Sequence, residues 1–327
     1  MIKRFSLFLV FISTLLAVNA RTIYVSASGT GNGTSWTLAT NDLQMALNQA
    51  RKGDEIWVSK GVYFPTKDNN REISFHIKDG VALYGSFVGF EQSIEDRIIK
   101  ANYSVLSGEI GTKQKTDNTI NVLYTAHVTK TTIIDGFIIT GGYAGGDSTS
   151  AGRRASGGGW YNDGANKGNV SNPTIRNCRF VENTARDGAA MYNNASNGGS
   201  CQVTLENCTF QNNKAYLGGG ALFNDGEKAG DCTLQIMDSK FLGNKAGFGG
   251  AIFNDGKDGK SVCLVRISVF KANQAMMEGG GIFNLSNGGV SQSKLMNCQF
   301  IANNAPKGST VADSQPVRKR TTRTKKI

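Results

Sequence analysis

Hydrophobic and polar positions alternate with a period of two in short runs that recur along the second half of the chain. Two examples are "CQVTLENCTF" at 201–210 and "CTLQIMDSKF" at 232–241. Alternation with this period is typical of β-strands with one buried face. No run of about 10–15 residues with helical spacing interrupts residues 155–305, so this part of the chain is predicted to be all-β.

The strand-like runs belong to a repeat. The motif Phe-x-x-Asn returns every 29 to 31 residues, with its first residue at Phe180, Phe210, Phe241, Phe270 and Phe300. A second motif keeps the same interval, and its copies "GGALFNDG" at 219–226 and "GGAIFNDG" at 249–256 differ at one position. Such a period indicates a solenoid, a propeller or an array. A propeller blade needs about 40–45 residues, whereas about three short strands joined by Gly and Asn turns fit this unit.

The sequence therefore predicts an all-β protein, a parallel β-helix with coils of about 30 residues over 55–305, whose right hand follows from the resemblance described below. In such a stack each residue lies about 4.8 Å above its counterpart, so like side chains form columns. One column is expected to hold side-chain amides that bond from coil to coil. Its members are Asn162, Asn193, Asn224, Asn254 and Asn284.

Two apolar columns flank the same motif. Leu222, Ile252 and Ile282 form an aliphatic column, and each is followed by Phe223, Phe253 or Phe283. Neighbouring residues of a strand point to opposite faces, so the aromatic column could lie outside and stack on sugar rings. The interpretation we favour is a bend that turns both columns inward.

The front of the chain differs from the repeats. Residues 1–20 combine two cations, an apolar run and a small-residue cleavage site, which predicts a signal peptide; the alternative is an uncleaved anchor. No other segment is long and apolar enough to span a membrane. "TNDLQMALNQARKGD" predicts a helix with Thr40 or Asn41 as its N-cap, inside an N-terminal cap over 21–54.

The formal net charge of +11 is concentrated at the two ends. Lys3 and Arg4 lie in the predicted signal peptide, and six basic residues crowd the last ten positions. The body carries only a small positive excess, so no nucleic-acid partner is expected. Residues 306–327 are predicted to be a basic, disordered tail, with attraction to an anionic surface as the alternative.

The six cysteines follow the repeat rather than a disulfide pattern. Cys178, Cys208 and Cys298 each lie two residues before the motif Phe, where other coils have Ser239 and Ser268. Small apolar residues suit an interior column, so buried free thiols are predicted. The alternative is one bridge between neighbouring coils.

Several segments resemble a known group of proteins. "IYVSASGTGNGTSWTLATNDLQMALNQARKGDEIWVSKGVYFPT", "KDGVALYGSFVGFE" and "TTIIDGFIITGGYAGG" are similar to secreted bacterial right-handed β-helix proteins. The Gly-Gly-Ala-Ile and Phe-x-x-Asn tetrapeptides resemble the polymorphic outer-membrane protein repeat of the chlamydial type. The resemblance covers residues 22–305. It implies a pectin lyase-like fold, a secreted or outer-surface location in a bacterium, and an adhesin-like role.

The sequence predicts a non-catalytic protein that binds an extracellular glycan or protein and is a monomer. The alternative is a polysaccharide lyase or glycoside hydrolase that acts on an acidic polysaccharide. For that alternative, Arg153 and Arg154 in the 143–157 insertion could approach Asp163 and form a catalytic cluster. Asp225 and Asp255 are weak Ca²⁺ candidates, although each stands in Asn-Asp-Gly, a common turn. No other cofactor is expected.

Overall fold

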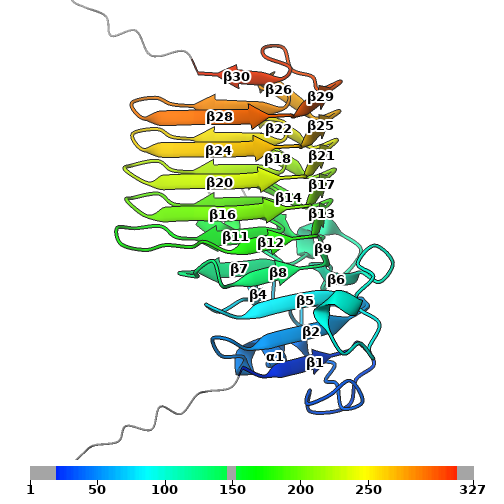
Figure 1. Cartoon of the computed structure of the whole chain (residues 1–327). Helices are drawn as coiled ribbons and strands as arrows, with labels where there is room; N and C mark the ends of the chain where they lie inside the picture. The colour runs from blue at the N-terminus through cyan, green and yellow to red at the C-terminus, as the bar shows by residue number, and fades with distance from the viewer. Residues whose placement is uncertain (1–19, 146–151, 315–327) are drawn as a thin grey trace, which may run out of the picture.

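The computed structural model describes residues 20–145 and 152–314. Within these ranges the chain winds into a parallel β-solenoid whose coils stack from the N-terminal to the C-terminal end (Figure 1). Every strand pair is parallel, and paired residues of successive repeats are 29 to 31 positions apart. The predicted all-β solenoid with coils of about 30 residues and a short helix near its start is confirmed.

Four sheets run along the stack, and each full coil contributes one strand to each of them. Sheet A consists of β1 (Thr22–Val25), β2 (Glu55–Ser59), β5 (Ala82–Phe87), β8 (Ile133–Asp135), β12 (Thr174–Arg176), β16 (Ser200–Glu206), β20 (Asp231–Met237), β24 (Lys260–Arg266) and β28 (Val290–Met296). Sheet B consists of β3 (Gly61–Tyr63), β6 (Ser104–Ser107), β9 (Phe137–Thr140), β13 (Arg179–Val181), β17 (Thr209–Gln211), β21 (Lys240–Leu242), β25 (Val269–Lys271) and β29 (Gln299–Ile301).

The other two sheets complete the coil. Sheet C consists of β4 (Phe75–His76), β7 (Leu123–Ala126), β11 (Trp160–Asp163), β15 (Met191–Asn194), β19 (Leu222–Asp225), β23 (Ile252–Asp255), β27 (Ile282–Leu285) and β30 (Val311–Asp313). Sheet D consists of β10 (Tyr143–Ala144), β14 (Thr184–Asp187), β18 (Lys214–Gly218), β22 (Lys245–Phe248) and β26 (Gln274–Glu278). The coils thus hold four strands rather than about three, because the segment after each Phe-x-x-Asn is extended and pairs with its neighbours.

Parallel pairing reaches beyond the predicted bounds of 55–305. At the front, β1 pairs with β2 in register, and at the end, β30 pairs with β27. The order of the stack therefore continues into residues 306–314. The predicted signal peptide up to position 19 and the tail from position 315 lie outside the described residues.

One α-helix, α1 (Leu43–Gln49), lies at the N-terminal end of the stack against β1, β2 and β4 (Figure 1). Its N-cap is Asp42, whose carboxylate accepts a hydrogen bond from the Met45 amide, so the predicted caps Thr40 and Asn41 were wrong by one or two positions. Leu43, Ala46 and Leu47 are buried against the first coils. The short 3-10 helices are η1 (Ile94–Asp96), η2 (Lys115–Asp117) and η3 (Gly152–Arg154). No helix in the described ranges is long and apolar enough to cross a membrane.

Columns of like residues fill the interior, as predicted. The rings of Phe210, Phe241 and Phe270 are fully buried and stack at centroid distances of 4.8 and 4.6 Å. The predicted amide column is confirmed: Asn193 donates to Asn224 at 3.0 Å, and Asn224 donates to Asn254 at 2.7 Å. All six cysteines are free and five of them are buried, whereas Cys298 is partly exposed.

Candidate functional site

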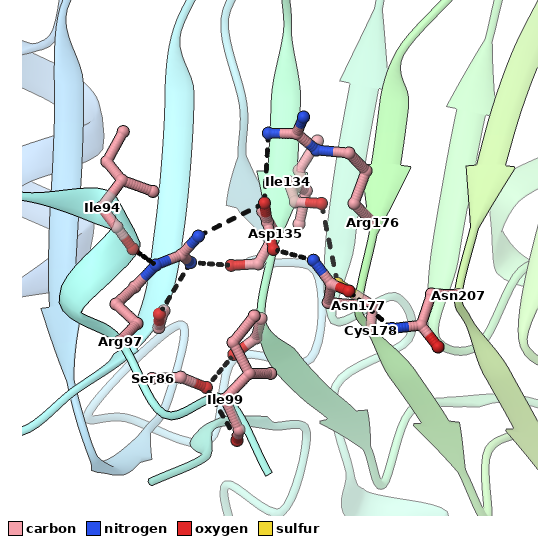
Figure 2. A network of polar contacts seen from close by, with 12 residues as sticks. Ser86, Ile94, Arg97, Ile99, Ile134, Asp135, Arg176, Asn177, Cys178 and Asn207 are labelled. Atoms are coloured by element: carbon pink, nitrogen blue, oxygen red, sulfur yellow. Dashed lines mark hydrogen bonds and ion pairs between the residues drawn. The ribbon is translucent and has the colours of Figure 1, made fainter.

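The segment between β5 and β6 folds against the outside of the solenoid and is fixed there by Arg97 (Figure 2). The Arg97 guanidinium donates to the carbonyl oxygens of Ile94 at 2.8 Å and Gly85 at 3.1 Å, and its Nη2 lies 3.4 Å from Asp135 Oδ2. The guanidinium carbon also lies 5.2 Å from the Tyr84 ring centroid. With both charged groups buried and multiply bonded, Arg97 anchors this segment to the solenoid.

Asp135 joins that segment to the neighbouring coils. Its carboxylate also forms an ion pair with Arg176 Nη2 at 3.1 Å and accepts a hydrogen bond from Asn177 Nδ2 at 2.8 Å. Asn207 Nδ2 donates in turn to Asn177 Oδ1 at 2.7 Å (Figure 2). Two guanidinium groups therefore share one carboxylate. They border a hollow of about 560 Å³ that extends along the corner between sheets A and B.

A groove of about 600 Å³ adjoins this hollow on the outer face of sheet B. We call it the basic groove. It lies between the anchored segment and three successive strands, β13, β17 and β21, whose residues Arg179, Thr209 and Lys240 are paired in register. Lys100 and Tyr103 of the anchored segment complete it.

The basic groove carries positive charge that the protein does not neutralise. Lys100, Arg179 and Lys240 form no ion pair within residues 20–145 and 152–314, and Asp238 is the acidic residue that lines the groove. Arg179 is held in place, since its guanidinium lies 5.6 Å from the Tyr103 ring and donates to Gln211 Oε1 at 3.3 Å. Arg179 and Lys240 are two coils apart, which is roughly 10 Å along the axis.

The candidate pair Asp225 and Asp255 lies in a second groove, of about 470 Å³, on the outer face of sheet C. We call it the acidic groove. The two residues are paired in register in adjacent coils. The Oδ1 atom of each accepts the backbone N–H two residues later at 3.0 Å, which is the turn bond expected of Asn-Asp-Gly.

The environment of these carboxyls disfavours their charge. Burial raises the pKa of Asp225, although the Tyr192 hydroxyl donates to its Oδ2 at 2.7 Å. Burial is also the main cause that raises the pKa of Asp255 to about 6. In the described part of the chain, no group of three or more His, Cys, Asp and Glu side chains is placed to hold a metal ion. A role for calcium here stays a prediction.

The predicted catalytic cluster is not joined by contacts. Arg153 lies over the Tyr124 ring at 4.8 Å and donates through Nε to Asn121 Oδ1 at 3.1 Å. Arg154 pairs with Glu72 at 2.8 Å. Asp163 accepts hydrogen bonds from the Ala165 amide and from Asn194. Among the described residues no hydrogen bond or ion pair links either arginine to Asp163.

The aromatic column faces outward, so the bend that would turn it inward was wrong. Phe223, Phe253 and Phe283 form a cluster separate from the main core, whereas Leu222, Ile252 and Ile282 are in that core. Phe223 and Phe253 nevertheless stack on each other, with centroids 4.6 Å apart and planes 6° apart. Tyr192 stacks on the other face of Phe223, whereas Phe283 is tilted by 50° to Phe253, so neighbouring rings already occupy both faces of Phe223 and one face of Phe253 and leave little room there for a sugar.

The basic groove was missed because its wall comes from a segment outside the repeat. A signal was available in the register: Arg179 and Lys240 precede motif Phe residues, so period-two geometry places them on the outer face. The partner segment could not be assigned in the same way, since Arg97 and Asp135 share no motif.

Comparison with known proteins agrees with the repeat. Residues 207–225 and 238–255 match the model of the Chlamydia polymorphic membrane protein (PMP) repeat. The chain is therefore a parallel β-solenoid that carries PMP-type repeats, as the resemblance implied. Among solved structures, a rhamnogalacturonan lyase aligns with 12% identity over 83% of this chain and 74% of that chain, with a TM-score of 0.27. That similarity is too low to carry an argument. A search of curated proteins gave no match.

Proposed function

We propose that this protein is a non-catalytic, adhesin-like surface protein that binds an acidic polysaccharide in the basic groove. The observation that carries the proposal is the set of three cations, Lys100, Arg179 and Lys240, that line one groove without carboxylate partners among the described residues. An extended polyanion would supply the missing charges one after another along the solenoid axis.

The chemistry of the groove suits a polysaccharide better than a small anion. Arg179 and Lys240 repeat at roughly 10 Å, on the scale of a disaccharide unit, so one chain could contact both. Thr209 lies between them and Gln211 beside them, which adds neutral hydrogen-bonding groups of the kind that hydroxyl-rich ligands need. Arg97 anchors the wall and Arg179 packs on Tyr103 without any ligand, which would lower the entropic cost of association.

The proposed location rests on the repeat. PMP-type repeats are named for membrane proteins, which supports a place on the bacterial outer surface or outside the cell. The predicted signal peptide agrees with this, although it lies outside the described residues. A surface location would expose the groove to extracellular polysaccharides.

Binding is tested by calorimetry with polygalacturonate, alginate and hyaluronate, using neutral dextran as the comparison ligand. At least one polyanion should bind and dextran should not, and affinity should fall as salt rises because the contacts are ionic. The variant Arg179→Gln/Lys240→Gln should lose about tenfold or more in affinity. The matched control, Lys130→Gln/Lys167→Gln, removes two exposed cations outside the groove and should bind like the parent.

The same samples test the absence of catalysis. Reducing ends and unsaturated products should not accumulate when the protein is incubated with each polyanion. Formation of either product, lost in Arg179→Gln/Lys240→Gln, would assign the groove to the lyase or hydrolase alternative. Equal binding of all ligands by parent and variant would reject the groove as the site.

A further inference from the structure

The acidic groove, which lies on a different sheet from the basic groove, has the architecture of a protein-docking site. Its floor consists of Phe223, Phe253 and Phe283, which are each less than a tenth exposed. Leu217 and Phe248, from β18 and β22, form an apolar wall. Asp225, Asp255 and Glu227 also line the groove, and the Arg186–Asp187 ion pair of β14 lies on the sheet D side, so the cleft combines an apolar floor with an excess of carboxylates.

Sheet D, which supplies this apolar wall, has further exposed apolar side chains on two strands that flank β22. Tyr216, Leu217, Met276 and Met277 are 47, 50, 70 and 54% exposed, on β18 and β26. Adjacent large apolar side chains at a surface mark interaction sites, and Tyr and Met are enriched in protein interfaces. Met side chains also adapt to irregular partners. These features favour a polypeptide over a sugar as the occupant.

The carboxylates specify the charge of that occupant. Asp225 is 7% exposed, and neither it nor Asp255 forms an ion pair in the described ranges. The other acids nearby are already matched: Asp187 pairs with Arg186 at 2.7 Å, and Glu227 pairs with Lys228 at 2.8 Å. A cation brought by a ligand would therefore meet two stacked carboxylates that form no ion pair among the described residues, although Lys228 and Lys257 lie near enough to act on them.

We propose that the acidic groove docks a polypeptide partner that inserts an apolar side chain against Phe253 and places a Lys or Arg side chain against Asp225 and Asp255. The proposal is independent of polysaccharide binding in the basic groove. Charge complementarity sets the chemistry of the partner, since an acidic or neutral segment would leave both carboxylates buried and unpaired.

Binding should weaken at low pH as a consequence. A cation stabilises the ionised carboxylates, whereas burial favours their protonated forms. With the pKa of Asp255 at about 6, affinity should fall about tenfold between pH 7.5 and pH 5. The other titratable or charged groups that face this pair are Tyr192, Arg186, Asp187, Glu227, Lys228 and Lys257.

The test pans a phage-displayed library of random peptides against the full chain, and then measures synthetic copies of the enriched peptides by calorimetry. We expect the enriched sequences to combine apolar residues with Lys or Arg, and their affinity to fall at least about tenfold in Asp225→Asn/Asp255→Asn. This variant should fold, because Asn194 occupies the same position in the coil below and makes the same turn. The control Glu182→Gln/Asp258→Asn removes two exposed carboxylates outside the groove and should bind like the parent.

Other occupants give different results, and each would overturn the proposal. Apolar, basic peptides whose affinity is unchanged in Asp225→Asn/Asp255→Asn, or an absence of such peptides among the enriched sequences, would show that the carboxylates do not select the partner. A dimer of the full chain in sedimentation, dissociated by that variant, would assign the groove to a second copy. Displacement of the enriched peptides by a synthetic peptide with the sequence of residues 315–327 would assign it to the chain's own C-terminal segment.

Discussion

Asn213 and Asn244 are joined by two hydrogen bonds, because Asn244 Oδ1 accepts both the backbone N–H of Asn213 at 3.1 Å and its side-chain amide at 3.0 Å. The Asn244 amide in turn donates to the Phe210 carbonyl at 2.9 Å and to Asn273 Oδ1 at 2.9 Å. Each amide of this fully buried column therefore uses both its oxygen and its nitrogen. The Asn of Phe-x-x-Asn therefore bonds backbone N–H and C=O groups of the preceding coil, and its bond to the Asn of the next coil fixes the register between them.

Asn244→Asp should destabilise the protein by about 2–5 kcal/mol at neutral pH. The new oxygen would face two acceptors, the Phe210 carbonyl and Asn273 Oδ1, and a carboxylate would be buried without a cation. Denaturant unfolding measures the loss. The control is Asn212→Asp, at the exposed position beside Asn213 in the adjacent coil, whose positive φ of 54° Asp tolerates. Equal stability of the two variants would contradict the role given to the column.

Phe241→Ala should cost about 2–5 kcal/mol. The Phe241 ring is fully buried between Phe210 and Phe270, so its removal leaves a cavity that rigid neighbouring coils cannot fill. Lys240→Ala, on the same strand but the opposite face, should change stability by less than about 0.5 kcal/mol. The difference between the two unfolding midpoints in denaturant checks the assignment, and a Phe241→Ala protein that unfolds like its parent would refute it.

The interior of the fold could be predicted from the sequence because stacking repeats it. Phe241 and Asn254 have counterparts at the same register in the coils above and below, so their columns follow from the period alone. The outer surface does not follow in this way. Phe253 lies outside the main core, yet it is covered by its neighbours and by Phe248, and the period carries no information about that cover.

The grooves depend on contacts between segments that share no pattern. Arg97 reaches Asp135 from an insertion outside the repeats, and this ion pair positions the wall that carries Lys100. Likewise, the sequence marked Asp225 and Asp255 as turn residues, whereas their surroundings depend on how sheet D folds against sheet C. Each such contact depends on individual residues that do not recur with the repeat, so composition and spacing could not predict it.

The cysteines should differ sharply in reactivity. Burial raises the pKa of Cys208 to about 12 and raises those of Cys178 and Cys232 well above the ordinary value, so the reactive thiolate is scarce and shielded. In the native protein at pH 8, we expect a thiol reagent to modify the partly exposed Cys298 rapidly and the five buried thiols only after unfolding. Cys298→Ser should abolish the fast phase. Rapid modification of several thiols in the native state would contradict their burial.

Asp255→Asn should stabilise the protein at pH 7.5 but not at pH 4. Burial raises the pKa of Asp255 from 3.8 to about 6, so the folded state binds a proton between these values that the unfolded state has lost. The contribution of Asp255 to the free energy of unfolding of the parent is therefore most favourable below about pH 4. This contribution is lost as the pH rises from about 4 through 6. A shift of this size corresponds to about 2–3 kcal/mol. Asn keeps the turn bond to the Lys257 amide, as Asn194 does with Ser196, and carries no charge to desolvate. Unfolding midpoints of parent and variant between pH 4 and pH 8 measure the effect, and curves that stay parallel over this range would show that Asp255 does not titrate as its burial requires.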